Sequence, residues 1–148
     1  MKHLKGGIIV VFSLFFFISC KTPKVVSVEK YKIEDTVWVL ELMRKKEMKY
    51  GEEEDKISIK FNRESGMFSG RSGCNQYFGK FAIQGDKLTI VEDIGSTRMA
   101  CFQELMSVEN TYLNILKSVN RYRIADEKLF LFQNELPVLT FSVVPEIK

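Results

Sequence analysis

The sequence predicts an α+β fold, in which a strongly curved antiparallel β-sheet of about 7–8 strands, a half-open barrel, wraps around one α-helix. Two observations predict it. Short runs rich in β-branched and aromatic residues recur at regular spacing before and after a single stretch of helical periodicity. The clearest runs alternate between apolar and polar residues, as half-buried antiparallel strands do. The chain of 148 residues, 45% hydrophobic and 28% charged, is long enough for one globular domain with a core.

The strands are expected at residues 36–43, 56–61, 67–71, 77–84, 87–91, 121–125, 128–133 and 138–144. In the run at 56–61, Ile57, Ile59 and Phe61 fall on one side and polar residues on the other. The runs at 77–84 and 87–91 flank a Gly-Asp turn and form the clearest hairpin, with an inward set of Phe81, Ile83, Leu88 and Ile90. From 102 to 119 apolar residues recur at helical spacing without Gly or Pro, which predicts one amphipathic helix of about four to five turns.

The N-terminus has the outline of a secretory signal peptide at residues 1–19: a basic start, an uncharged stretch at 6–17 and a small residue before Cys20. The uncharged stretch is too short for a transmembrane helix, which needs about 20 apolar residues. Residues 17–20 resemble a bacterial lipobox, so Cys20 is the expected lipid attachment site; the alternative is an ordinary signal peptide cut near Ser19. Residues 20–34 are polar and Pro-marked, and we expect them to tether the lipid to a folded domain at 35–148.

Charge and histidine content exclude several classes of partner and site. Removing residues 1–19 takes away two lysines and no acids, so the formal net charge falls from +3 to +1. The basic cluster at 44–46 is answered by an acidic one at 52–55, so nucleic acid is not an expected partner. The only histidine, His3, lies in the signal peptide, which excludes His-dependent nucleophilic sites and His-ligated metals from the processed chain. We expect no metal and no cofactor.

The Gly-rich segment 70–81 invites comparison with a phosphate-binding loop, but Cys74 stands where that loop needs a Gly and Phe81 where it needs Ser or Thr. Its glycines are better explained by a tight corner between strands, with Asn75 bonding back to the local backbone. Cys74 and Cys101 are the thiols left once Cys20 carries lipid, and in an exported chain they predict a disulfide. Two separately buried thiols, or a redox-active pair, are the alternatives.

The run Leu129-Phe130-Leu131-Phe132 is apolar on both faces. Either it is a central strand covered on both sides, or it borders a hydrophobic groove for a lipid or peptide. The groove would be lined by Trp38, Tyr112, Phe130 and Phe132. For the lone Trp38, a buried core position competes with a role as a ligand-stacking platform.

Two motifs, in this order and at this spacing, resemble those of the META domain, also called the HslJ-like family. The matching positions are Gly73, Cys74, Asn75 and Gly79, then Ser96, Thr97, Met99 and Cys101, then Met106, Glu109, Tyr112 and Leu116 in the expected helix. Trp38 with Leu40 matches the opening strand of the family, and Leu129 with Leu131 a late one. The resemblance covers about residues 33–144.

The resemblance implies a small antiparallel sheet around a helix, similar to the cracked barrel of the secretin pilot lipoproteins. It also implies an envelope location, heat-shock or drug-tolerance associations, and no established enzymatic activity. We therefore expect a monomeric, non-catalytic, stress-related lipoprotein that binds a hydrophobic peptide, a lipid or an envelope partner. Lys21 after Cys20 favours the outer membrane, facing the periplasm or the surface. The alternative function is a thiol-disulfide redox protein using Cys74 and Cys101; a hydrolase has no acidic pair that stands out.

Overall fold

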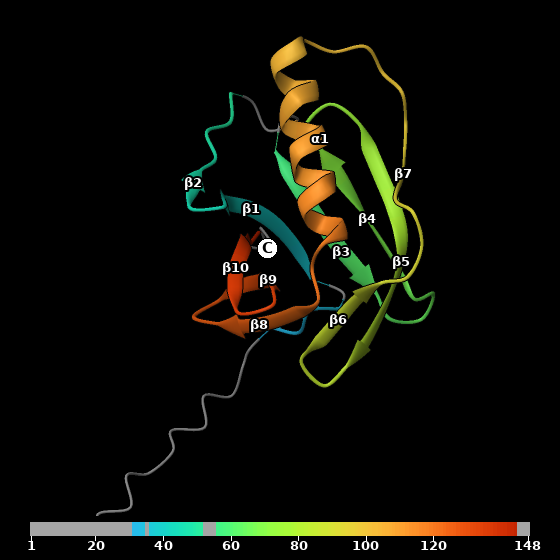
Figure 1. The fold of residues 1–148 in the computed structure, drawn as a ribbon, viewed down its shortest axis with the longest axis vertical. Helices are drawn as coiled ribbons and strands as arrows, with labels where there is room; N and C mark the ends of the chain where they lie inside the picture. Colours follow the sequence, from blue (N-terminus) through green and yellow to red (C-terminus); the bar gives the residue numbers. More distant parts are fainter. Residues whose placement is uncertain (1–30, 35, 52–55, 145–148) are drawn as a thin grey trace, which may run out of the picture.

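The computed structural model describes residues 31–34, 36–51 and 56–144 (Figure 1). The acidic run expected at 52–55 lies outside the described residues. Along the chain the elements are β1 (Val37–Met43), β2 (Lys46–Glu47), β3 (Ile57–Asn62), β4 (Met67–Ser72), β5 (Gln76–Gln84), β6 (Lys87–Ile90), β7 (Gly95–Ser96), α1 (Gln103–Lys117), β8 (Arg121–Ala125), β9 (Lys128–Gln133) and β10 (Leu136–Val143).

The strands form an antiparallel ring in the order β1-β3-β4-β5-β6-β8-β9-β10, and the ring closes because β10 also pairs with β1. The predicted fold class is confirmed, and the sheet closes further than a half-open barrel. Trp38 lies opposite Ile59 on one side and Val143 on the other, so β1 is paired along both edges. The weakest joint is between β6 and β8, where a single pair, Lys87 with Arg121, connects the strands.

The helix α1 crosses one side of the ring, in front of β3 and β4 as Figure 1 is drawn. Its buried side chains are Glu109, Tyr112, Ile115 and Leu116, so the predicted apolar stripe points into the barrel. The core that it helps to fill is otherwise built from the inward positions of the strands, including Trp38, Leu40, Ile59, Phe61, Phe68, Tyr77, Leu88, Leu129, Leu131 and Phe141. In the part of the chain that is described, no helix is long and apolar enough to span a bilayer.

The folded domain begins earlier than the expected boundary at residue 35. Ile33 is 2% exposed and belongs to the core, and its carbonyl oxygen accepts a hydrogen bond from the indole N–H of Trp38 at 3.1 Å. Glu34 forms an isolated bridge with Phe61. Residues 31–34 therefore belong to the domain rather than to the tether. The polar composition of this stretch hid the boundary, because a single apolar side chain, that of Ile33, attaches it to the core. The expected signal peptide and Cys20 lie outside the described residues.

Candidate functional site

The four residues predicted to line a groove do not lie together. Trp38 and Tyr112 are fully buried in the core. Phe130 and Phe132 point to the outer side of β9, because alternation along the strand turns Leu129 and Leu131 inward. The guanidinium of Arg123 lies 5.3 Å from the ring centre of Phe130, and that of Arg121 lies 5.9 Å from the ring centre of Phe132. Residues 129–132 thus have one side in the core and an outer side whose aromatic rings lie under arginine side chains.

A buried polar corner joins the end of β4 to the start of β5. Residues 72–75 are all buried, and Gly73 has a φ of 99°, a left-handed conformation that favours glycine. Cys74 forms a disulfide with Cys101, and their Cα atoms are 6.1 Å apart. The corner and the segment that leads into α1 are therefore covalently tied.

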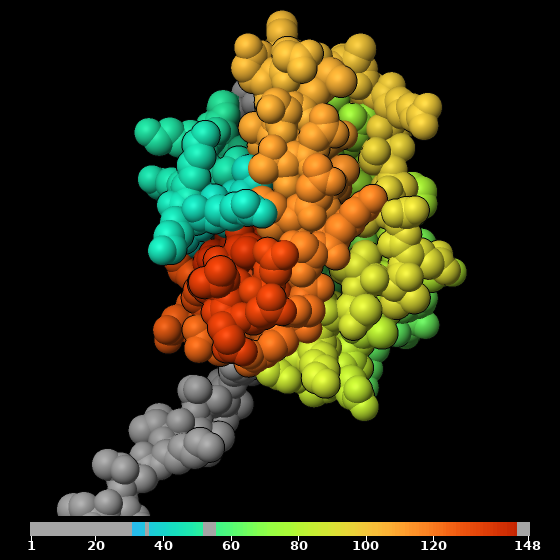
Figure 2. All heavy atoms as spheres, in the orientation of Figure 1, coloured from blue at the N-terminus to red at the C-terminus, as the bar shows by residue number. Residues whose placement is uncertain are grey.

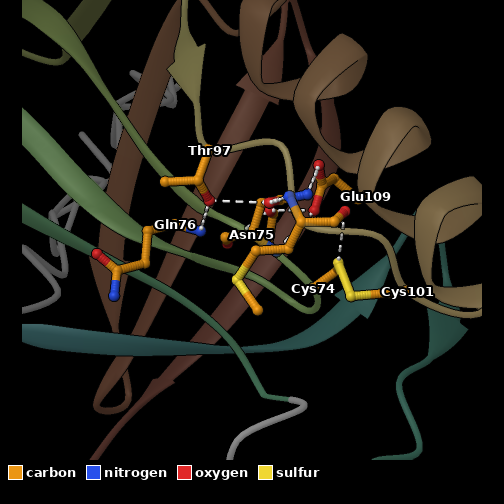
Figure 3. The surroundings of a disulfide bond; sticks show 8 residues. Cys74, Asn75, Gln76, Thr97, Cys101 and Glu109 are labelled. Atoms are coloured by element: carbon orange, nitrogen blue, oxygen red, sulfur yellow. Dashed lines mark hydrogen bonds between the residues drawn. A yellow bond between two sulfur atoms is a disulfide. The ribbon is translucent and has the colours of Figure 1, made fainter.

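Glu109 of α1 reaches into this corner and is 7% exposed (Figure 3). Its Oε2 accepts hydrogen bonds from the Ser72 hydroxyl at 2.7 Å and from the Asn75 backbone N–H at 3.0 Å. Its Oε1 accepts one from the Asn75 side-chain amide at 2.9 Å. The carboxylate thus replaces the hydration it lost on burial with three donors, as a buried charge requires.

The sequence suggested that the Asn75 side chain bonds back to the local backbone. In the structure it connects three segments instead. While its amide nitrogen donates to Glu109, its Oδ1 accepts from the Thr97 hydroxyl and from the Met99 backbone N–H, each at 2.8 Å. The local bond is made instead by Ser72, whose backbone N–H donates to the Asn75 carbonyl at 2.8 Å. This arrangement of partners fixes the amide orientation of Asn75, because the oxygen must face two donors.

The segment between β7 and α1 is held at alternate residues. Thr97 exchanges backbone and side-chain hydrogen bonds with Gln76, Met99 donates its N–H to Asn75, and Cys101 is in the disulfide. The carbonyl oxygen of Met99 also lies 3.6 Å from Cys74 Sγ, a contact rather than a hydrogen bond because a disulfide sulfur carries no hydrogen. The backbone of this segment is therefore held at every second residue from Thr97 to Cys101.

Large apolar side chains project outward from the fixed segment. Met99 is 60% exposed, Phe102 80% and Met106, one helical turn later, 37%. We call Met99, Phe102 and Met106 the rim patch. Phe102 is also the first flanking residue of α1, and its carbonyl accepts the Met106 N–H at 3.2 Å, so the two lie on neighbouring turns of one face.

A second buried polar contact joins the helix to the sheet. The hydroxyls of Tyr77 on β5 and Tyr112 on α1 lie 2.5 Å apart, and the Tyr77 hydroxyl also donates to the Ser58 carbonyl at 2.9 Å. Burial raises the pKa of Tyr77 well above its ordinary value, and the neighbouring Tyr112 adds to the rise. Burial also raises the pKa of Tyr112, although its hydrogen bond with Tyr77 opposes this. Both hydroxyls are therefore neutral at physiological pH.

The chemistry of the corner is that of a complete hydrogen-bond network. Within the described residues, every buried side-chain nitrogen or oxygen has a partner. The same part of the chain holds no group of three or more His, Cys, Asp or Glu suited to a metal ion. The carboxylate of Glu109 is fully used in joining α1 to the corner, and what the corner offers to the outside is the rim patch.

Sequence reasoning assigned Glu109 a motif position but no physical role. A signal for the role exists: Leu105, Glu109, Tyr112 and Leu116 share the inward stripe of the helix, so an acid lies where periodicity predicts an apolar residue. What periodicity cannot supply is the partner, because Ser72 and Asn75 lie more than thirty residues away along the chain.

A family model described as the META domain matches residues 31–145. The chain belongs to the META-domain family. Among solved structures, this META domain is similar to an NMR structure of a protein from Burkholderia xenovorans, with a TM-score of 0.61 and 27% identity over 77% of this chain and 85% of the other. A second NMR structure of a protein gives a TM-score of 0.60 at 24% identity, over 78% and 95% of the two chains, and supports the fold. A search of the curated proteins finds no significant match.

Membership in the family, with these neighbours, fits a non-enzymatic domain of the envelope type. The structure gathers most of the META motif positions at one place: Gly73, Cys74, Asn75, Thr97, Met99, Cys101 and Glu109 all lie in or against the corner. Ser96 pairs with Tyr77 beside it, and Gly79 lies further along β5, opposite Phe68. The motif therefore describes how helix and sheet are joined.

Proposed function

We propose that this META domain is a lipid-anchored, non-catalytic envelope protein that holds an apolar segment of a partner protein against the rim patch. The observation that carries the proposal is the 80% exposure of Phe102 on a backbone that is pinned on both sides. Burying a Phe side chain is worth about 1.5–3 kcal/mol, so a fold that displays one gives up that stabilisation. Grouped exposed apolar side chains are typical of interaction sites.

The composition of the rim patch suits a peptide-like partner. Phe102 offers a rigid ring, and Met99 and Met106 add flexible thioether side chains that adapt to irregular apolar surfaces. The charged residues Arg98 and Glu104 are exposed beside them and supply a polar border. Because the backbone is already fixed by the disulfide and by Asn75, binding would order little of this chain.

The position of the rim patch supports a partner rather than the anchoring membrane as its occupant. The described chain begins beside Phe61, at the end of β3 remote from Ile57, which pairs with Ser72 near the corner. Figure 1 shows the start of α1 at the opposite end of the barrel from residues 31–34, and in Figure 2 the residues that open α1 form one end of the molecule. A domain anchored through its N-terminus would present the patch away from the bilayer.

The anchor itself belongs to the same proposal. Lipidation of Cys20 would leave eleven residues to Tyr31, which span at most about 40 Å when fully extended. Several acyl chains, at about 0.8 kcal/mol per buried CH₂, make such attachment effectively permanent. An outer-membrane location and a role in envelope integrity under stress are consistent with Lys21 and with the family, and mass measurement of the N-terminal peptide would report the acyl chains.

The rim patch is tested by peptide selection with the processed full chain in phosphatidylcholine vesicles. A displayed library of 12-residue peptides is selected on wild-type protein and counter-selected on a variant carrying F102S and M106S. Labelled peptides are then titrated by fluorescence anisotropy. We expect enriched peptides with spaced apolar or aromatic residues that bind wild type at least about tenfold more tightly than the double variant, the equivalent of about 1.4 kcal/mol.

The matched control is L136S, because Leu136 is 68% exposed but lies on β10, away from the rim patch. It should leave peptide binding unchanged. Selection that yields no peptides, or peptides that bind all variants equally, would refute the rim patch as a binding surface. If the rim patch itself binds the vesicles without any peptide, and this binding depends on Phe102, the patch belongs to the membrane instead.

A further inference from the structure

The methionines of the described chain differ widely in exposure, and both methionines of the rim patch are on the exposed side of that range. Met99 is 60% exposed, and Met67 and Met106 are each 37% exposed. Met43 is 8% exposed and belongs to the core, and Met48 packs against that core. Because susceptibility to oxidation follows exposure, an oxidant dissolved in water reaches Met99 most readily.

Other side chains that oxidants attack are protected by the fold. Cys74 and Cys101 are joined in the disulfide, so neither offers a thiol. Trp38, the only tryptophan of the chain, is fully buried. Among the sulfur-containing side chains of the described residues, a two-electron oxidant therefore meets exposed thioethers and no free thiol.

The fold holds Met99 at the surface. Its backbone N–H donates to Asn75 Oδ1 at 2.8 Å, and Cys101, two residues later, is bonded to Cys74. Moving the thioether into the core would require breaking these bonds. Both Met99 and Met106 lie outside the hydrophobic core, so a change of polarity at their sulfur atoms leaves the packing of the core in place.

We propose that Met99 is a site of reversible oxidation that changes the rim patch from apolar to polar and so releases its partner. The inference rests on the proposed function of that patch. Hydrogen peroxide transfers one oxygen atom: the sulfur lone pair attacks the peroxide, the O–O bond breaks, and the sulfur loses two electrons while the other oxygen leaves as water. A reductase reverses the step with two thiols, which become a disulfide as the sulfoxide oxygen leaves as water.

The sulfoxide opposes burial of the rim patch. A thioether gains free energy when an apolar partner covers it, because its surface is removed from water. The S=O group is polar, so the same partner would take away its hydration without supplying a hydrogen-bond donor. Phe102 lies between Met99 and Met106 along the chain, so oxidation places a polar group beside the most exposed ring of the patch. The partner therefore dissociates while the domain stays folded.

The test uses the processed full chain in dimyristoylphosphatidylcholine vesicles, whose saturated acyl chains resist peroxide. The protein is treated with hydrogen peroxide, the oxidant is removed, and the oxidised residues are mapped by mass. The probe is the most enriched labelled peptide recovered on the rim patch that lacks Met, Cys and Trp. We expect Met99 to be oxidised first and Met43 last. Peptide binding should weaken about tenfold with the midpoint of urea unfolding unchanged. The two methionine sulfoxide reductases, one for each epimer, should restore binding.

Leucine variants separate the sulfoxide of the rim patch from other products of oxidation. M99L keeps an apolar side chain of similar volume and should retain most of its binding after peroxide, and M99L with M106L should retain all of it. M67L is the matched control, because Met67 is as exposed as Met106 but lies on β4, outside the rim patch. It should lose binding as wild type does. M99Q is polar without peroxide and should bind about tenfold more weakly from the start.

The outcomes distinguish this inference from the proposed function. Absence of peptide binding by the unoxidised chain would refute both. If the unoxidised chain binds, the inference alone is overturned by oxidation of Met99 no faster than that of Met43, by equal binding before and after oxidation of Met99, or by a loss that M99L does not prevent. A fall in the unfolding midpoint on oxidation of Met99 would also overturn it, because the loss of binding would then follow from unfolding.

Discussion

Replacing Glu109 by Gln removes one acceptor from a buried network without changing its size. The carboxylate accepts from Ser72 and the Asn75 backbone at Oε2 and from the Asn75 amide at Oε1. A Gln side chain has one acceptor and one donor group, so in either orientation its NH₂ group faces a donor. The Asn75 amide cannot turn to compensate, because its oxygen accepts from Thr97 and Met99.

The expected loss follows from the bonds. Hydrogen bonds to a charged group contribute about 1.5–3 kcal/mol each, and a buried donor without an acceptor costs about 1–3 kcal/mol. We therefore expect E109Q to lower the free energy of unfolding by about 2–4 kcal/mol. The matched control on the same helix is E104Q. It should lower that free energy by less than about 1 kcal/mol, because Glu104 is exposed in the first turn and its charge acts only on the helix dipole.

Urea unfolding followed by fluorescence measures both variants, since Trp38 is the only tryptophan and is fully buried. A companion variant, N75D, places a carboxylate oxygen opposite Glu109 and should also be destabilised. The double variant N75D with E109Q restores a donor facing an acceptor. Its loss of unfolding free energy should therefore be smaller than the sum of the two single losses, by about 1–3 kcal/mol. E109Q no more destabilised than E104Q, or no rescue in the double variant, would refute the described network.

Three other changes give expected outcomes. C74S with C101S should cost about 3–4 kcal/mol by the chain-entropy estimate for a 27-residue separation, measured by urea unfolding; an unaltered stability with a lost cellular function would favour redox chemistry. I33A should cost about 2–4 kcal/mol in the same assay if the domain begins before residue 35, and nothing if it does not. The pKa values of Tyr77 and Tyr112 are raised in the folded protein, so their stabilising contribution is complete below the unfolded value near 10 and is lost as the pH rises above it. With two protons involved, the free energy of unfolding should fall by about 2.7 kcal/mol per pH unit in that range. Y112F should reduce this slope by about half, measured by unfolding at alkaline pH.

The strands and the helix could be predicted from the sequence because their signals are local. Alternation along 57–62 and helical spacing along 103–117 depend only on which residues must face inward. The disulfide was expected from the count of thiols left in an exported chain. Closure of the barrel was not, because the pairing of β1 with β10 joins the two ends of the domain and has no local pattern.

The site was harder to predict than the fold. Trp38, Tyr112, Phe130 and Phe132 were grouped by composition, but strand alternation and helix packing send two of them inward and two outward. Asn75 was expected to bond locally, whereas its partners Thr97 and Glu109 become neighbours only after the chain has folded. The rim patch also has no sequence signal, because nothing local distinguishes an exposed Phe in a segment between strand and helix from a buried one.

The central claim is that the rim patch receives an apolar segment of a partner. The most direct measurement is site-specific photocrosslinking in intact cells, with benzoyl-phenylalanine at position 102 and, as the control, at the exposed position 136. Mass mapping of the crosslinked peptides identifies what each position touches. The account predicts one apolar protein segment joined to position 102 and absent from position 136, and lost when M106S is added. Crosslinks to lipid alone, or the same products from both positions, would contradict it.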